Sequence, residues 1–481
     1  MTVGGGGGGG NIFLYIFTPD KISIRTTIIP MMDNIPYLII FLVVMATWVK
    51  EVIIATFEYS LNCWYNSIGM TKIRTRFAPS PTGAMHIGSL RTALYSFALA
   101  QHARGDFILR IEDTDKKREV AGSKEGIKEL LGIFALNWDE YYVQSERVGE
   151  NIYKKAAERL VAAGHAYYSD GAIRLKIPKH ETVSFHDFVL DKDVAWNTDT
   201  LEDLVLLKSD GFPTYHLAVV VDDVDMKITH VLRGHDWLPS TPVHLLIYKY
   251  LGFSLPKIGH LTDILDPEGG KLSKRKGSIT CEGLLQEGYL PDAILNFIML
   301  LGWAPKDNRE LFTLEEFVKA FDTKGFQKSN PVFNQAKLDW FNGEYIRKTQ
   351  NSKLKNQIFN FLDKKYDEEL IAKTIPLVKE RITKLSDYWL LAKFFFIRPK
   401  VDKKLLGKNY TKHLNIAMEA LKKNITLDQI SRDNNFKTGD FFMDLRIAVT
   451  GSKFTPPINE SIVILGKDET LIRLRHAISN F

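Results

Sequence analysis

Cysteine is scarce in this chain, since its 481 residues include only Cys63 and Cys281. So few thiols exclude a disulfide-built scaffold and a cysteine-rich zinc site, and they suit a reducing compartment. A strong compositional bias is absent as well, because 45% hydrophobic and 25% charged residues are ordinary for a soluble globular protein. The length is enough for two or three domains with cores of their own.

Long hydrophobic runs are also lacking. The apolar segment from Ile35 to Val49 has 15 residues, whereas a membrane-spanning helix usually needs about 18 or more. The same region contains a glycine tract from Gly4 to Gly10, is poor in arginine and carries acidic residues, which argues against a transit peptide. We expect residues 1–69 to be an N-terminal extension outside the core of the protein, with a membrane anchor or an unusual targeting segment as alternatives.

Charge is distributed unevenly along the chain. The net charge is +6, but residues 347–481 contain 26 Lys and Arg against 15 Asp and Glu, a local balance of +11. A basic C-terminal third suggests a polyanionic partner held through phosphate contacts. The alternative is an ordinary solvated helical surface.

The first informative segment joins a short strand-like run, 73–77, to an apolar-periodic run, 90–100, through a loop rich in proline and glycine. The loop places His86 and Gly88 at the expected start of a helix. Backbone N–H groups and the helix dipole at such a start favour phosphate oxygens, and a glycine lets a ligand lie against the backbone. This segment predicts a nucleotide site, with a plain turn as the alternative.

The second segment is the basic run from Gly269 to Ser278, which has glycines near both ends. Read alone, it indicates either a mobile cationic loop or a solvated surface loop. Together with a phosphate-binding helix start, however, it provides what transfer at a triphosphate requires. The helix start holds the phosphates, and the lysines neutralise the charge that develops in the transition state.

These two segments resemble known motifs. His86-Ile-Gly-Ser89 resembles the HIGH motif, and Lys271-Leu-Ser-Lys274-Arg275 resembles the KMSKS motif, of class I aminoacyl-tRNA synthetases. The loop Arg76-Phe-Ala-Pro-Ser-Pro-Thr-Gly83 narrows the resemblance to the glutamyl-tRNA synthetase family. Further matches extend the resemblance from about Lys72 to the C-terminus, and they include 109–115, 211–218, 220–223, 338–343 and a C-terminal signature at 440–451.

The resemblance implies an α/β fold: a Rossmann-type, doubly wound parallel-sheet catalytic domain, a helical stem-contact region and an all-α anticodon-binding domain. The implied boundaries are 70–153 and 211–265 for the two halves of the catalytic domain, 154–210 for the connecting module that contacts the tRNA acceptor end, 266–346 for the stem-contact region with the KLSKR loop, and 347–481 for the anticodon-binding domain. The connecting module is shorter than in relatives. A four-residue turn, Ser169 to Ala172, lies between the Tyr-Tyr and Arg-Leu-Lys segments, where relatives usually insert some tens of residues.

The resemblance also implies the site. His86, Lys271 and Lys274 would be catalytic, and the ATP-binding set would be Gly83, His86, Gly88, Lys271, Ser273 and Lys274. Glutamate would be bound by Arg76, Ser80, Glu112, Tyr215 and Arg233. Charge complementarity favours two of these roles, because a carboxylate such as Glu112 suits a substrate ammonium and an arginine such as Arg233 can hold a carboxylate bidentately.

The implied enzyme is an ATP-dependent glutamate–tRNA ligase that forms glutamyl-adenylate and transfers the glutamyl group to the 3′ adenosine of tRNA-Glu. Mg²⁺ would accompany the ATP phosphates, no zinc is expected, and the enzyme is expected to be a cytoplasmic monomer whose core has no membrane contact. An organellar or membrane-tethered location stays open, and so does charging of tRNA-Gln as well as tRNA-Glu. The rival hypotheses are an inactive synthetase-derived tRNA-binding protein and a nucleotidyltransferase acting on a small metabolite.

Local patterns add expectations about individual elements. The run Val219–Asp223 predicts a buried strand, and residues 256–280 predict a turn-rich segment. Helices are expected at 152–163, 241–251, 291–301 and 314–321, and throughout the chain after Arg347. We expect Asp113 and Asp115 to cap the helix that follows them rather than to bind a ligand.

Overall fold

The computed structural model describes residues 11–14, 27–30, 72–272 and 279–479. The chain divides into two units, Met1–Lys72 and Ile73–Phe481. In the first unit, β1 (Asn11–Leu14) pairs antiparallel with β2 (Thr27–Pro30). The glycine tract, the apolar segment 35–49 and Cys63 lie outside the described residues. Within the described residues, no helix combines the length and the apolar character needed to cross a membrane.

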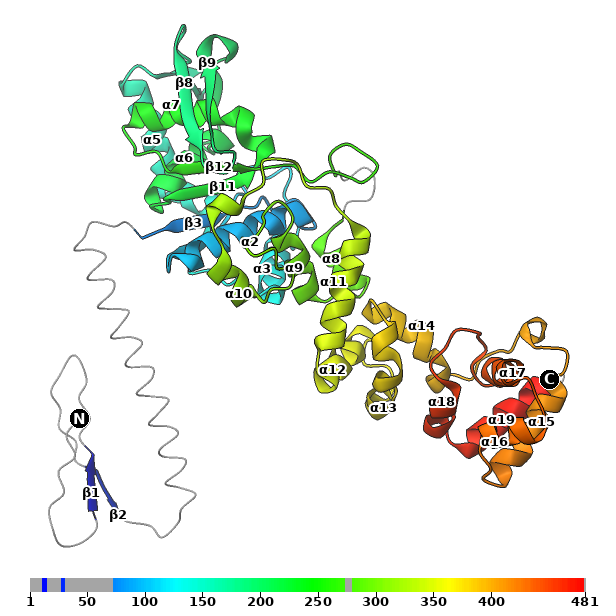
Figure 1. Ribbon diagram of the computed structural model, residues 1–481. Helices are drawn as coiled ribbons and strands as arrows, with labels where there is room; N and C mark the ends of the chain where they lie inside the picture. The colour runs from blue at the N-terminus through cyan, green and yellow to red at the C-terminus, as the bar shows by residue number, and fades with distance from the viewer. Residues whose placement is uncertain (1–10, 15–26, 31–71, 273–278, 480–481) are drawn as a thin grey trace. The chain divides into compact units, whose positions relative to one another are not determined.

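The second unit begins with a parallel sheet of strand order β3-β4-β5, formed by β3 (Arg74–Phe77), β4 (Asp106–Ile111) and β5 (Glu140–Val143). Helix α2 (Ile87–His102) connects β3 to β4, and α3 (Ser123–Ile133) connects β4 to β5 (Figure 1). Residues 107–111 are buried without alternation, as expected for a parallel strand covered on both faces. The strand expected at 73–77 and the helix expected over 90–100 are confirmed.

The rest of the parallel sheet comes from a distant part of the sequence. Strands β11 (His230–Gly234) and β12 (Lys257–Leu261) are parallel neighbours. On the far side of β12 lie β8 (Thr182–Asp187) and its antiparallel partner β9 (Lys192–Asn197). The amide of Thr229 donates to the carbonyl of Arg74, which places the start of β11 beside β3. The two halves therefore form a doubly wound α/β domain, as predicted.

Two local predictions in this region were wrong. Val219–Asp223 is part of a helix, α6 (Tyr215–Asp225), and not a strand. Its residues from Leu217 to Asp223 are all buried, and a helix buried on every side has no amphipathic period to distinguish it from a buried strand. The segment expected to be rich in turns contains β12, whose five residues are too few to show a clear pattern.

Between the halves lies a smaller sheet. Helix α5 (Ile152–Ala162) leads into β6 (Ala166–Ser169), β7 (Ala172–Leu175) and β10 (Leu204–Leu207), which form an antiparallel sheet of order β10-β7-β6. Asp170 and Gly171 both have positive φ, 51° and 76°, as in the tight turns that match the twist of a two-stranded hairpin. The short connection expected between Ser169 and Ala172 is confirmed, and α7 (Thr241–Leu251) lies where a helix was expected.

Helices dominate after β12. Helix α8 (Cys281–Gln286) precedes α9 (Pro291–Met299), α10 (Leu314–Ala320) and α11 (Gln335–Lys348), and the expected helices at 291–301 and 314–321 are confirmed. The buried hydroxyl of Tyr95 in α2 donates to the carbonyls of Met299 and Leu301, which ties these helices to the parallel-sheet domain. The predicted boundary at 346/347 falls inside α11, and that at 153/154 falls inside α5.

The C-terminal third is entirely helical in the residues described, as predicted (Figure 1, yellow to red). Its buried side chains form two separate hydrophobic clusters, one around Ile358, Ile375 and Tyr388 and the other around Leu414 and Leu445. The helices are α12 (Asn351–Phe361), α13 (Glu368–Val378), α14 (Leu385–Phe396), α15 (Tyr410–Lys422), α16 (Leu427–Asp433), α17 (Thr438–Thr450), α18 (Ile458–Leu465) and α19 (Lys467–Ile478).

Candidate active site

A cavity of about 370 Å³ lies where β3, β4 and β11 end and α2 begins. This volume is in the range of small-molecule sites, and the carboxyl ends of parallel strands are where such sites form in open α/β sheets. Eight predicted site residues line it: Arg76, Ser80, His86, Gly88, Glu112, Tyr215, Arg233 and Lys271. The structure thus brings together residues that lie up to 195 positions apart in the sequence.

The other predicted site residues are not in this lining. Gly83 does not line the cavity. Its φ of +113° is one that glycine adopts readily, and in the structure the residue forms part of the turn before α2. Ser273 and Lys274 lie outside the described residues. The cavity is also lined by Arg118, Asp236 and Trp237, to which the sequence analysis gave no role. The sequence offered a signal only for Asp236 and Trp237, which follow the predicted site residue Arg233 within four positions.

The start of α2 differs from expectation in one respect. His86 is the N-cap residue, and its Nδ1 accepts a hydrogen bond of 3.0 Å from the amide of Gly88. The amide of Ile87 donates to the carbonyl of Ile279. The prediction that these N–H groups are free for phosphate was therefore wrong for this conformation. Because Nδ1 accepts, the proton of the neutral His86 ring lies on Nε2, the nitrogen able to donate.

Backbone pairing joins the two motif segments. The amide of Cys281 donates to the carbonyl of Met85 over 2.9 Å, and His86 and Thr280 form a β-bridge. On the other side of the basic loop, the amide of Leu272 donates to the carbonyl of Ile264. Both flanks of the loop are therefore fixed at the cavity, which explains how segments nearly two hundred residues apart form one site.

Lys271 lies between two carboxylates. Its Nζ forms ion pairs with Asp236 and, at 3.0 Å, with Asp263. Burial lowers the pKa of Lys271, but the hydrogen bonds to these carboxylates outweigh burial and raise it above the ordinary value. Lys271 is therefore a fixed cation at the cavity wall.

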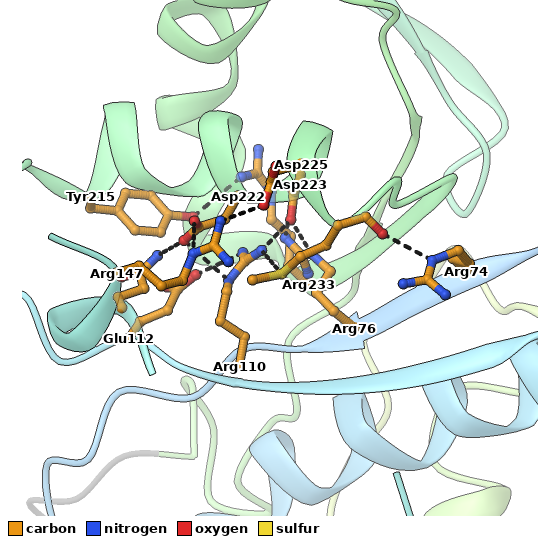
Figure 2. A network of polar contacts seen from close by, with 12 residues as sticks. Arg74, Arg76, Arg110, Glu112, Arg147, Tyr215, Asp222, Asp223, Asp225 and Arg233 are labelled. Carbon is orange, nitrogen blue, oxygen red and sulfur yellow. Dashed lines mark hydrogen bonds and ion pairs between the residues drawn. The ribbon is translucent and has the colours of Figure 1, made fainter. Parts of the chain in front are cut away.

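A buried network of charges lies beneath the cavity (Figure 2). The fully buried guanidinium of Arg110 contacts Asp223 at 2.7 Å and Glu112 at 2.9 Å. Arg76 pairs with the same Asp223 at 3.2 Å and donates to the carbonyl of Leu232. Burial raises the pKa of Asp223, yet the charges of Arg76 and Arg110 outweigh it and keep this pKa below its usual value. Asp223 thus links two cationic side chains that position the cavity floor.

The neighbouring aspartates serve the fold. Asp222 is fully buried and accepts hydrogen bonds from Arg147 and Tyr153. Asp113 does not cap α3, which begins after Gly122 without a side-chain cap. It accepts instead from the amide and hydroxyl of Ser145, at the start of the short helix α4 (Gln144–Arg147). The capping prediction was wrong because Asp113 contacts an element over thirty residues away.

Arg233 is a nearly buried cation without a carboxylate partner among the described residues. Its side chain is 5% exposed, and every hydrogen-bond acceptor that it contacts among the described residues is neutral. Nε donates to His260 at 3.0 Å, Nη2 to Thr241 at 2.8 Å, and Nη1 to Tyr215 at 3.3 Å, with His244 Nδ1 3.1 Å from Nη1. Burial lowers the pKa of Arg233. Burying a charge without a counter-charge is unfavourable, so this side of the cavity suits an anionic ligand.

A model of the catalytic domain of class I tRNA synthetases (E and Q) matches residues 72–172 and 169–340, and a model of an anticodon binding domain matches 345–478. A glutamate–tRNA ligase of Dehalococcoides mccartyi is 38% identical over 85% of this chain and 98% of its own length. A glutamate–tRNA ligase of Treponema denticola is 35% identical over 85% of this chain and 99% of its own length. A crystal structure of a glutamate tRNA ligase from Elizabethkingia meningosepticum, in complex with its amino acid, has a TM-score of 0.75 and 32% identity, covering 85% of this chain and all of that one.

A Rossmann-type domain with these motifs at the ends of its strands, followed by helical domains, is the class I aminoacyl-tRNA synthetase fold. Within that class, the chain belongs to the glutamate–tRNA ligase family.

Proposed function

We propose that the chain joins L-glutamate to tRNA-Glu in two steps, the first of which consumes ATP. The observation that carries this proposal is Arg233, a buried guanidinium held only by neutral acceptors in the same cavity as His86 and Lys271. An anion-binding arginine in one cavity with a histidine and a lysine that can contact phosphates is what the activation of an acidic amino acid requires. The related ligase whose structure contains its amino acid supports the same role for the cavity.

Glutamate binding uses the charged groups of the cavity. Arg233 takes the side-chain carboxylate, and Arg76 adds positive charge on the β3 side. Glu112 pairs with the ammonium. Its pKa is raised by burial, an effect that Arg110 partly offsets, so a bound cation would stabilise its ionised form. Tyr215 and Ser80 complete the pocket.

In the first step, an oxygen of the glutamate α-carboxylate attacks the α-phosphorus of ATP. The bond from the α-phosphorus to the bridging oxygen breaks, and pyrophosphate leaves. The protein positions the reactants and stabilises charge rather than forming covalent bonds. His86, the backbone at Gly88, and Lys271 are the described groups that lie at the cavity for this purpose. The motif resemblance assigns Lys274 to stabilising the charge that develops on the phosphates. It assigns Gly83 and Ser273 to the loops that bind ATP.

In the second step, a ribose hydroxyl of the tRNA 3′ adenosine attacks the activated carbonyl, and AMP leaves. Class I membership implies the 2′-hydroxyl. The residues 347–481 are assigned to anticodon binding, 266–346 to the stem-contact region and 154–210 to the acceptor end. The basic balance of residues 347–481 supports a polyanion there. Charging of tRNA-Gln as a second substrate stays an open alternative, while a monomeric state and a cytoplasmic location stay predictions.

Magnesium would enter with ATP. Among the described residues there is no group of three His, Cys, Asp or Glu side chains able to hold a metal. Asp236 and Asp263, two carboxylates that line the cavity, are paired with Lys271. These residues do not form a magnesium cage, and Mg²⁺ commonly binds through substrate phosphates and water. We derive no step through it, and the absence of zinc remains a prediction.

The test is a charging assay with labelled glutamate and transcripts of tRNA-Glu and tRNA-Gln. We expect the full-length chain to charge tRNA-Glu, and a variant that begins at Met70 to do so at a similar rate. The tRNA-Gln reaction decides whether the second substrate is accepted. Retained tRNA binding without any charging by the full-length chain would contradict the proposed function and favour a tRNA-binding protein.

A further inference from the structure

Behind Arg233, a row of polar side chains crosses three neighbouring strands of the parallel sheet. Arg233 on β11 is directly opposite His260 on β12, and Asp187 ends the next strand, β8. The Nδ1 of His260 is 2.7 Å from Asp187 Oδ2, and its Nε2 accepts from Arg233 Nε at 3.0 Å. His260 and Asp187 are both fully buried, and neither lines the cavity.

The carboxylate of Asp187 is fixed by its own surroundings. Its Oδ1 accepts from the amides of Val189 and Leu190, each at 3.0 Å, and both oxygens are within 3.3 Å of the amide of His260. Burial raises the pKa of Asp187, but the His260 hydrogen bond and the backbone amides outweigh it and lower this pKa. An ionised carboxylate with no hydrogen to give requires a donor at His260 Nδ1.

This requirement fixes the state of the histidine. With the proton on Nδ1, the neutral ring presents its Nε2 lone pair to Arg233 Nε. Burial lowers the pKa of His260, and the charge of Arg233 lowers it further. The hydrogen bond to Asp187 raises this pKa, but not enough to bring it back to its usual value. Arg233 therefore has a well-oriented acceptor that does not neutralise its charge.

The guanidinium has five N–H groups. Among the described residues it contacts His260, Thr241, Tyr215 and His244, and these contacts leave one Nη2 hydrogen for another acceptor. The contact to Tyr215, a cavity-lining residue, is the longest of these at 3.3 Å. A ligand carboxylate can accept from the remaining Nη2 hydrogen and from the Nη1 hydrogen that faces Tyr215, and it supplies the missing negative charge.

We propose that Asp187 and His260 are positioning residues, which aim Arg233 into the cavity and reserve its charge for a ligand carboxylate. They thereby favour a carboxylate side chain over the corresponding carboxamide. A carboxylate in place of the His260 acceptor would neutralise Arg233, whereas a neutral acceptor leaves the charge to the ligand. The inference rests on the proposed role of Arg233 in glutamate binding.

Two substitutions of His260 separate its two hydrogen bonds. In His260→Gln, the amide oxygen can reach the former Nε2 position and accept from Arg233. In His260→Asn, the amide nitrogen can replace Nδ1 as donor to Asp187, but nothing reaches Arg233. Calorimetric titration of the full-length protein with glutamate and, separately, with glutamine measures the result. We expect His260→Asn to weaken glutamate binding about tenfold or more, with a smaller effect on glutamine, and His260→Gln to stay within about threefold of the wild type.

Asp187→Asn provides an independent test with almost no change in shape. An amide donor facing Nδ1 forces the ring proton to Nε2, where it opposes the Arg233 N–H. We expect a loss of glutamate affinity similar to that of His260→Asn. The matched control is His413→Asn, because His413 also lies in a buried pair, 2.7 Å from Asp444, but in the C-terminal helices. The glutamate affinity of His413→Asn should equal that of the wild type.

Thermal melting of each variant identifies those that are unfolded, and the remaining variants then decide the outcome. Unchanged glutamate affinity in His260→Asn and Asp187→Asn would contradict the positioning role. An equal loss in His260→Gln and His260→Asn, or a loss in the His413 control, would show a general effect of removing buried histidines and overturn it too. A wild-type chain that binds glutamate but charges no tRNA would contradict the proposed function alone, and one that binds no glutamate would contradict both.

Discussion

The strongest prediction on stability concerns Asp223. Its replacement by Asn leaves the fully buried Arg110 with Glu112, but it removes the only carboxylate partner that Arg76, which is 4% exposed, has among the described residues. Breaking a buried pair by removing one partner typically costs about 3–5 kcal/mol, because the remaining charge is uncompensated. For a domain of this size, about 1 kcal/mol corresponds to roughly 2–4 °C. We expect the melting temperature to fall by roughly 6–20 °C.

Asp222→Asn is the matched control, since it is the adjacent residue and equally buried. Its partner Arg147 also pairs with Asp225 at 2.6 Å, so no cation loses its last carboxylate. Burial raises the pKa of Asp222, which means that the fold already disfavours its ionised form. Differential scanning calorimetry at neutral pH should show less than half the shift of Asp223→Asn. Equal shifts would refute the assignment of Asp223 as the shared counter-charge.

Three further predictions concern catalysis, binding and pH. Lys274→Ala should reduce tRNA-dependent ATP–pyrophosphate exchange by about two orders of magnitude or more, as for loss of one preorganised donor, while melting is unchanged; near wild-type exchange would remove Lys274 from the mechanism. Arg233→Ala should chiefly raise the KM for glutamate, and a change in tRNA affinity alone would contradict the pocket assignment. Burial raises the pKa of Asp113, but Lys124 and Ser145 outweigh it and lower the pKa to about 2. The stability from Asp113 should therefore be complete above its unfolded pKa and be lost as pH falls towards 2. In urea unfolding at several pH values, wild type and Asp113→Asn should differ most near neutral pH and converge in acid; a constant difference would contradict this.

The sequence predicted the main features of the fold because several signals agreed. Strand β3, the glycine-rich turn and the apolar period of α2 each indicated the same strand–loop–helix unit, and the structure confirms it. The C-terminal helices followed from apolar spacing alone. The failure at Val219–Asp223 has a clear physical cause, since side chains buried on every side leave no polar face in the sequence.

Contacts between distant residues could not be derived from local patterns. The capture of the Gly88 amide by His86 and the contact of Asp113 with Ser145 depend on side-chain geometry that spacing does not encode. The same holds for the row behind Arg233: neither Asp187 nor His260 has a sequence signature, and they meet only because β8 and β12 are neighbours. Charge type did predict Arg233 and Glu112 at the cavity, because Arg233 lies near the end of β11 and Glu112 directly follows β4.

The position of β8 bears on how such proteins can be recombined. The strand belongs to the stretch predicted as the acceptor-end module, 154–210, yet its last residue, Asp187, contacts His260, which accepts a hydrogen bond from Arg233 at the cavity. Residues 154–210 therefore cannot be exchanged as an independent unit. A chimera that imports 154–210 from another synthetase would replace part of the amino-acid pocket's support along with the tRNA contact, and only a graft that keeps the end of β8 would separate the two.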